Sequence, residues 1–220
     1  LLWFGWLGFN GGSALAANGL ASTAFVNTFF APAAAAAAWG LAELFLHGKV
    51  SGVGLASGAV AGMVAITPAA GFVKPASGLA IGGLAALASF TAIRIRPKLG
   101  LDDSLDVFAV HGVAATLGAL LTGVFASTAV NSAGADGSLA LLGKQALGVV
   151  VTMAFSGALS FGLYKLVGAI TPLAADQQDQ WAGMDQVDAG ERAYISGDSD
   201  STSAAAAAPA ASSVPAAATH

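Results

Sequence analysis

The residue best placed for chemistry in this sequence is His111, an imidazole inside a long apolar stretch. The stretch opens with Asp102-Asp103-Ser104 and continues as LDVFAVHGVAATLGALLTGVFA. Titratable side chains are costly at such depth in a membrane-length segment, and they mark ion or proton pathways. A neutral imidazole carries both a donor and an acceptor, and it titrates near neutral pH. We therefore expect a functional role for His111, against the alternative of a ring satisfied by a neighbouring helix.

Residues just before His111 are of the types that begin helices. Asp103 or Ser104 is predicted to cap the helix, and Asp106 is placed to favour its positive end. Capping at the cytoplasmic interface explains these residues at least as well as direct chemistry does. At about 100° per residue, Val107 and His111 lie one turn apart on one face. The imidazole is therefore predicted to look over an apolar wall.

A second group of candidates lies at the start of the chain, where aromatic side chains precede a hydroxyl. It comprises Trp3, Phe4, Trp6, Phe9, Asn10 and Ser13. Aromatic faces attract cations, and a hydroxyl accepts a hydrogen bond from an ammonium ion. The alternative is an aromatic belt at the membrane interface, which composition alone slightly favours.

Polar residues also fall inside other apolar stretches. Asn27, Ser57 and Thr67 could bond across helices or line a pathway, and interhelical bonding is the default expectation. Glu43 is predicted to be an interfacial charge, and His47, in the following connection, to be solvated.

Membrane spans are the elements that must position these residues. The 220-residue chain is 56% hydrophobic and 9% charged, and its mean hydropathy is +0.75. These values indicate an integral membrane protein. The chain has no cysteine, and its three histidines lack metal-binding spacings, so we expect no disulfide, metal or other cofactor. Without a basic patch interleaved with aromatic residues, nucleic acid is not an expected partner.

Apolar stretches of about 20 residues, long enough to cross a bilayer, alternate with short polar connections. We predict an all-α polytopic protein with one partial and five full spans, at about residues 1–15, 20–46, 51–71, 77–96, 104–129 and 141–170. Leu1 lies within an apolar run, which predicts a chain cut within a span rather than a signal peptide. Glycines at four-residue spacing predict close helix packing, as in Gly54, Gly58 and Gly62, or Gly78 and Gly82.

Basic residues can be counted by side, because successive connections lie on opposite faces of the membrane. The side of the C-terminal tail holds Lys49, Arg94, Arg96, Lys98 and Lys165, and the other side holds Lys74 and Lys144. The positive-inside rule therefore predicts a multi-pass protein with a cytoplasmic C-terminus. Residues 1–175 form the predicted transmembrane domain, residues 176–196 a cytoplasmic tail, and residues 197–220 a disordered Ala/Pro/Ser-rich end.

Four segments are specific enough to indicate a family: LLWFGWLGFNGGS, AFVNTFFA, SGAVAGMVAITPAAGF and DDSLDVFAVHGV. Their order and spacing closely resemble the second half of the ammonium transporter (Amt/MEP/Rh) family, over about residues 1–195. The resemblance implies a cell-membrane homotrimer with one pore per subunit, each subunit an eleven-helix inverted-repeat bundle with its substrate at the repeat interface. The chain would supply about the sixth to eleventh helices.

By this resemblance, His111 is the second of two pore histidines that share a hydrogen bond, the first belonging to a segment absent from this chain. Phe9 matches one of two stacked phenylalanines that gate the outer mouth, and Ser13 matches a hydroxyl that helps to hold ammonium outside them. Trp6 and Val107 match residues of the pore wall. Asp103 would be the structural counterpart of an aspartate in the other repeat.

The implied function is transport of ammonium or ammonia, with methylammonium as an analogue, and not an enzymatic reaction. Ammonium would shed water and its proton before crossing a dry pore. Residues 183–196 resemble a tail that in relatives contacts neighbouring subunits and a PII-type regulatory protein. Two alternatives stay open: an ammonium sensor on the same fold, and half of an unrelated proton-coupled secondary transporter that uses His111 as a relay.

Overall fold

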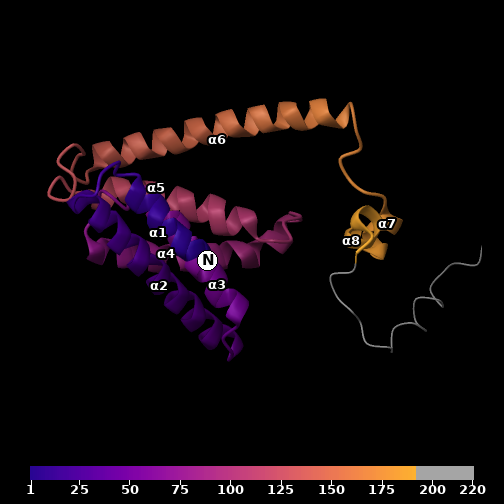
Figure 1. Ribbon diagram of the computed structural model, residues 1–220, viewed down its shortest axis with the longest axis horizontal. Helices are drawn as coiled ribbons and strands as arrows, with labels where there is room; N and C mark the ends of the chain where they lie inside the picture. Colours follow the sequence, from indigo (N-terminus) through magenta and orange to yellow (C-terminus); the bar gives the residue numbers. More distant parts are fainter. Residues whose placement is uncertain (192–220) are drawn as a thin grey trace, which may run out of the picture. The chain divides into compact units, whose positions relative to one another are not determined.

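The computed structural model describes residues 1–191, whose regular structure is helical apart from one isolated β-bridge (Figure 1). The predicted end at residues 197–220, and residues 192–196 before it, lie outside the described part. The helices are α1 (Leu2–Gly12), α2 (Gly19–His47), α3 (Gly52–Ile66), α4 (Pro75–Ile95), the 3-10 helix η1 (Arg96–Leu99), the π-helix η2 (Phe108–Val113), α5 (Ala114–Phe125), α6 (Leu139–Gly168), α7 (Gln177–Ala182) and α8 (Met184–Ala189). The first compact unit covers residues 1–159, and the second starts at Ser160.

Within residues 1–191, four helical stretches are long and apolar enough to cross a membrane, in agreement with the all-α prediction. They are Gly19–His47, Pro75–Leu99, Phe108–Phe125 and Leu139–Gly168. The predicted span at residues 51–71 is wrong at its end, because α3 stops at Ile66 and the chain continues in turns. Pro68 has no N–H to donate to the Val64 carbonyl, which accepts instead from the Thr67 N–H at 3.3 Å as the helix ends.

Close backbone contacts hold α2 against α3 and α4, as the glycine spacing predicts. A Cβ atom at Gly58 would stand 2.7 Å from the Trp39 Cβ, and one at Gly62 would stand 2.6 Å from the Ala35 Cβ. A Cβ atom at Gly82 would collide with the Ala31 backbone. Larger side chains at these glycines would therefore force the helices apart.

Two polar side chains tie α2 to neighbouring segments. Asn27 is fully buried, and its Nδ2 donates to the carbonyls of Ala70 and Val73 at 2.8 Å each. Both carbonyls lie in the connection between α3 and α4, so Asn27 binds a connection and not another helix as expected. Near the C-terminal end of α2, the Glu43 carboxylate accepts hydrogen bonds from the Ser51 backbone N–H (2.7 Å) and the Ser51 hydroxyl (2.9 Å). Glu43 therefore ties α2 to the start of α3.

Two connections meet at one end of the first unit. Val73 and Ala126 form an antiparallel bridge, and the Ser127 N–H donates to the Phe72 carbonyl at 2.8 Å. Asp136 then holds the loop after α5 by accepting from the Thr128 N–H at 2.7 Å. The sequence places both connections on the same side of the membrane, and the structure brings them together.

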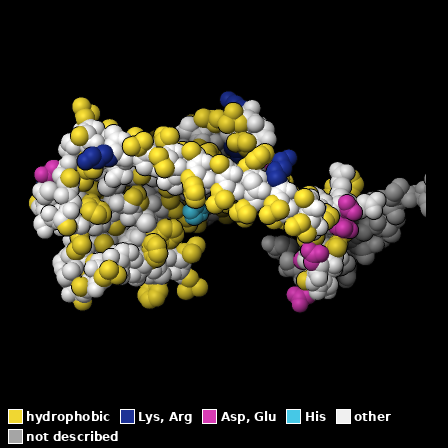
Figure 2. All heavy atoms as spheres, turned by 90° about the horizontal axis from the view of Figure 1, so that it is seen from above, with side chains coloured by type: hydrophobic (Ala, Val, Ile, Leu, Met, Phe, Trp, Pro, Cys, Tyr) yellow, Lys and Arg dark blue, Asp and Glu magenta, His cyan; other side chains and the backbone are white. Residues whose placement is uncertain are grey.

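Hydrophobic side chains are spread over much of the visible surface in Figure 2, and charged ones are few along the spans. On α6 no residue is buried, and Leu147, Val151 and Phe155 are 65%, 57% and 68% exposed. Such continuous apolar exposure indicates contact with lipid or with further protein.

Candidate functional site

His111 lies on η2 and lines two cavities of the first unit. One cavity, of about 780 Å³, is also lined by Arg96, Asp103 and Val107. The other, of about 620 Å³, is also lined by Trp6 and Thr67. The His111 side chain is exposed, and its ring makes no hydrogen bond with the residues that the structure describes. Neighbouring described helices therefore leave both ring nitrogens available to a ligand or to further protein.

A third cavity extends this arrangement toward the end of α1. It has a volume of about 340 Å³, and Phe9, Ser13 and Thr67 are among its lining residues. Thr67 belongs to this cavity and to the second one, and His111 belongs to the second and the first. The three cavities thus form a series from Phe9 and Ser13, past Thr67 and His111, to Arg96 and Asp103.

The aromatic group at the start of the chain is tied to this series. Trp6 Nε1 donates to the Thr67 hydroxyl at 2.8 Å, and the Trp6 and Phe9 rings meet edge to face with centroids 6.4 Å apart. The Ser13 hydroxyl donates to the Phe9 carbonyl at 2.8 Å, which leaves its oxygen lone pairs free to accept. Phe9 itself is 63% exposed. Trp6, Phe9 and Ser13 therefore line cavities, as a cation pathway requires.

Sequence reasoning missed a buried polar link beside these residues. Asn10 is 5% exposed and Thr28 is fully buried, and Asn10 Nδ2 donates to the Thr28 hydroxyl at 2.9 Å. Trp3 Nε1 donates to the Thr28 carbonyl at 3.0 Å. These bonds hold α1 against α2. The sequence predicts a bonding role for Asn27, the residue before Thr28. It does not show that Asn27 bonds to the connection after α3 while Thr28 bonds to α1.

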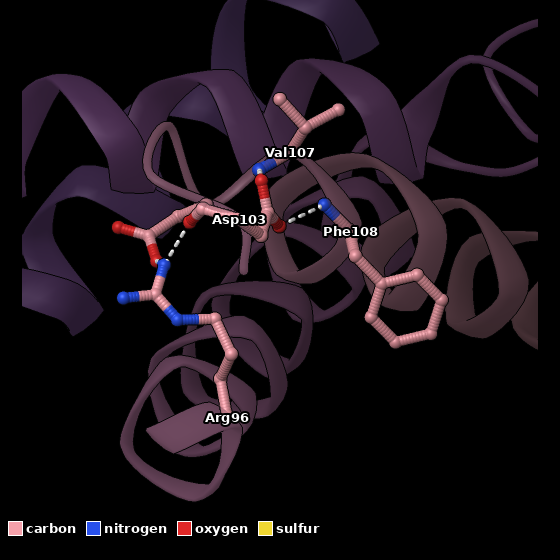
Figure 3. Close-up of polar contacts among 5 residues, drawn as sticks. Arg96, Asp103, Val107 and Phe108 are labelled. Atoms are coloured by element: carbon pink, nitrogen blue, oxygen red, sulfur yellow. Dashed lines mark hydrogen bonds and ion pairs between the residues drawn. The ribbon is translucent and has the colours of Figure 1, made fainter. Parts of the chain in front are cut away.

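Asp103 binds N–H groups at the start of the His111 helix, although the helix begins after Asp106 and not directly after Asp103 as the predicted N-cap would require. Its two carboxylate oxygens accept from the N–H groups of Val107 (2.9 Å) and Phe108 (2.8 Å), as Figure 3 shows. Ser104 lies in the preceding turn and makes no such bond. Asp106 has a role that its position in the sequence did not predict, because its carboxylate pairs with Arg96. Arg96 Nη1 also donates to the Asp103 carbonyl.

The assumed rotation of about 100° per residue is wrong for residues 108–113, which form a π-helix. A π-helix turns less per residue than an α-helix, so the angular positions of its side chains differ from those of an α-helical wheel. Val107 and His111 still line the same cavity. The predicted apolar wall beside the imidazole is therefore present.

The other predicted polar residues lie outside the cavity series. Ser57 is half-buried on α3, and no hydrogen bond joins its hydroxyl to the described residues. His47 is exposed, with its ring centroid 6.1 Å from that of Phe90. Glu43 and Asn27 are structural ties, and of the four polar residues inside apolar stretches only Thr67 lines the series.

Comparison with known proteins identifies the family. The model of the Ammonium Transporter Family matches residues 1–194. The chain is 44% identical to an ammonium transporter of Bacillus subtilis (strain 168), over 88% of the chain and 49% of that protein. It is 40% identical to the ammonium transporter Amt1 of Archaeoglobus fulgidus, over 88% of the chain and 50% of the relative. The chain thus spans about half the length of the curated relatives it matches.

Solved structures give the same result for the fold. The crystal structure of Saccharomyces cerevisiae Mep2 matches with a TM-score of 0.68 and 38% identity, over 72% of this chain and 37% of that one. A structure titled Sensor Amt Protein matches with a TM-score of 0.77 and 30% identity, over 86% of this chain and 47% of that one. Sequence and structure agree, and this chain belongs to the ammonium transporter family.

Proposed function

We propose that this chain is part of a protein that carries ammonium or ammonia across the cell membrane. The observation that carries the proposal is the series of three cavities joined at Thr67 and His111. Relatives with 40 to 44% identity are named ammonium transporters, which supports the choice of substrate. The alternative of an unrelated proton-coupled transporter falls, because the chain belongs to this family.

We assign the roles along the series from its polar and aromatic groups. Phe9 and Ser13 recruit the cation through the ring face and the hydroxyl oxygen. Trp6 lines the next cavity with Thr67, whose hydroxyl it holds in place. His111 then offers a donor and an acceptor in one ring, so it can take up a proton or hydrogen-bond ammonia. Val107 supplies apolar wall on the far side.

Discrimination against potassium follows from the chemistry of the substrate. Ammonium can leave its proton behind and cross an apolar pore as ammonia, whereas potassium has no proton to release and would have to cross as an ion. The His111 ring is free of hydrogen bonds to the described residues, which supports pairing with a second histidine supplied by the rest of the protein.

The assembled protein is proposed to be a homotrimer of inverted-repeat subunits with a cytoplasmic C-terminus. The tail at residues 176–196, of which residues 176–191 are described, is the proposed contact for neighbouring subunits and for a PII-type regulator. Within it, α7 and α8 pack on each other. A size measurement in detergent and a pull-down with a PII-type protein test these two partners separately.

A second candidate function is ammonium sensing on the same fold. The match to the structure titled Sensor Amt Protein, with a TM-score of 0.77, supports sensing as a second candidate. A sensor would bind methylammonium without net uptake, whereas a transporter would accumulate it or conduct it. Uptake by the protein expressed from its complete coding sequence therefore separates the two.

The decisive experiment compares His111→Ala with His47→Ala. In proteoliposomes, His111→Ala is expected to lower methylammonium uptake by about tenfold or more, or to admit potassium, because a proton-handling group is lost. His47→Ala is the matched control, since His47 is exposed at the end of α2, outside the cavity series. Uptake and selectivity that stay at wild-type values in His111→Ala would overturn the role assigned to His111.

A further inference from the structure

We propose that Arg96 and Asp106 form a clamp that sets the rotation of η2, and through it the direction in which His111 faces the pathway. The effect of the clamp on transport rests on the proposed function. The contacts that form the clamp do not depend on it. Arg96, on η1, and Asp106, just before η2, make an ion pair across ten residues of sequence. Neither residue is a ligand of the substrate in this proposal. Both act through the position of His111.

The backbone at Asp106 has a conformation that requires support. Its φ is 55°, in the left-handed region that residues other than glycine seldom adopt, although aspartate tolerates it better than most. The Asp106 N–H donates to the Asp103 carbonyl at 3.1 Å, and its own carbonyl accepts from Val110 at 2.9 Å. Asp106 is therefore the pivot between the turn and the helix that carries His111.

Arg96 holds this pivot from two sides. The same guanidinium nitrogen donates to the Asp103 carbonyl and to the Asp106 carboxylate, and Figure 3 shows the Arg96 side chain reaching toward Asp103. The side chains of Arg96 and Asp106 are only 26% and 31% exposed. Partly buried pairs are screened less than surface pairs, so this contact has a greater effect than an exposed ion pair would.

The Asp103 carboxylate completes the clamp at the helix end. It accepts from both Val107 and Phe108, and the π-helix begins at Phe108. Arg96 thus fixes the backbone of Asp103 while the side chain of Asp103 fixes the first N–H groups of the span. A shift at Arg96 is passed to the helix start through a single intervening residue.

The rotation of η2 decides where the imidazole lies. A π-helix has one more residue in each hydrogen-bonded turn than an α-helix, so conversion to an α-helix would rotate the residues beyond it by about 100° relative to the helix start. Val110, beside His111, is 7% exposed in the core. Positions 110 and 111 lie within η2, so conversion would turn them through part of this angle. Val110 would move toward the direction that His111 now has, and His111 would turn away from it.

The test measures the rotation of η2 from the reactivity of single cysteines and requires no transport measurement. Single cysteines replace His111 or Val110 in protein from the complete coding sequence, and the rate of reaction with a small cationic methanethiosulfonate is measured in proteoliposomes. With Arg96 present, His111→Cys is expected to react about tenfold faster than Val110→Cys, because only position 111 faces the cavities. Adding Arg96→Ala or Asp106→Ala is expected to lower this ratio by about tenfold, and the combination of both to lower it no further.

Three further variants make the result specific. Arg94→Ala is the matched control, because Arg94 lies over the Phe90 ring and not against Asp106. It should leave the ratio unchanged. Arg96→Lys keeps the charge and should restore most of the ratio, whereas Arg96→Gln keeps a donor but no charge and should lower it. Arg96→Gln also decides the matter if Arg96→Ala does not assemble in the membrane.

The same variants separate the clamp from the proposed function. In protein that retains His111, Arg96→Ala should lower the maximal rate of methylammonium uptake by about tenfold and change the KM less than about twofold, because Phe9 and Ser13 are untouched. An unchanged 111-to-110 ratio in Arg96→Ala and Arg96→Gln overturns the clamp. If the wild-type protein neither transports nor conducts methylammonium, the proposed function is overturned. The ratio of the reaction rates at positions 111 and 110 still tests the clamp, because its measurement does not depend on transport.

Discussion

At the scale of the residue, Asn27 stabilises the fold through two buried hydrogen bonds. Its amide donates to two buried carbonyls, those of Ala70 and Val73, which would have no other described donor. Asn27→Ala should therefore lower the free energy of unfolding by about 2 kcal/mol. Thermal unfolding in detergent measures it. The control is Thr91→Ala, because the exposed Thr91 hydroxyl bonds only within its own helix, to Leu87, and its change should stay within about 0.5 kcal/mol. Equal unfolding temperatures for the two variants would contradict the argument.

The residues that could be predicted are those whose chemistry contrasts with their surroundings. His111, Asp103 and Asn27 stand out because a polar or titratable group in an apolar stretch needs a partner or a function. The Arg96 and Asp106 pair could not be predicted in the same way. The pair joins residues on either side of a turn in which Asp106 has a left-handed backbone, and neither hydropathy nor helical spacing encodes that turn.

At the scale of the element, the contact between α2 and α4 depends on the absence of a side chain at one position. A Cβ atom at Gly82 would collide with the Ala31 backbone, whereas Gly83 has nothing within 4 Å of such an atom. Gly82→Ala should destabilise the protein by about 1 to 3 kcal/mol through helix displacement. Gly83→Ala should be neutral or stabilise by about 0.5 to 1 kcal/mol, since alanine favours the helix. Chemical unfolding of both variants in detergent measures the difference, and a stable Gly82→Ala protein would show that the helices separate freely.

Spans could be predicted to within a few residues, because length and apolar composition alone decide what crosses a membrane. The differences arise where local bonding overrides hydropathy. The predicted span runs to residue 71, yet α3 ends at Ile66, just before Pro68, which has no N–H for a further helical bond. Residues 108–113 are as apolar as a helix requires, but composition does not distinguish a π-helix from an α-helix. The direction of His111 therefore had to come from the structure.

At the scale of the whole molecule, the cavity series and the ends of the spans give one consistent orientation. Phe9, Ser13 and Phe72 line the cavity at one end of the series, and the Ser127 N–H bonds to the Phe72 carbonyl at that end. Arg96 and Asp103 line the cavity at the other end. Most basic residues of the spans are predicted to lie on the side of Arg96, so the positive-inside rule predicts that the Phe9 end faces the outside of the cell.

This orientation can be tested with two single cysteines, because the chain has none of its own. Ala133→Cys lies in the exposed loop after α5, and Lys98→Cys lies exposed on η1. In intact cells, a membrane-impermeant maleimide should label Ala133→Cys, while Lys98→Cys should be labelled only after permeabilisation. Both sites are exposed, so a difference in labelling reports the side of the membrane rather than burial. The reverse pattern would place Phe9 and Ser13 at the cytoplasmic mouth, and they could then no longer be the residues that recruit ammonium from outside.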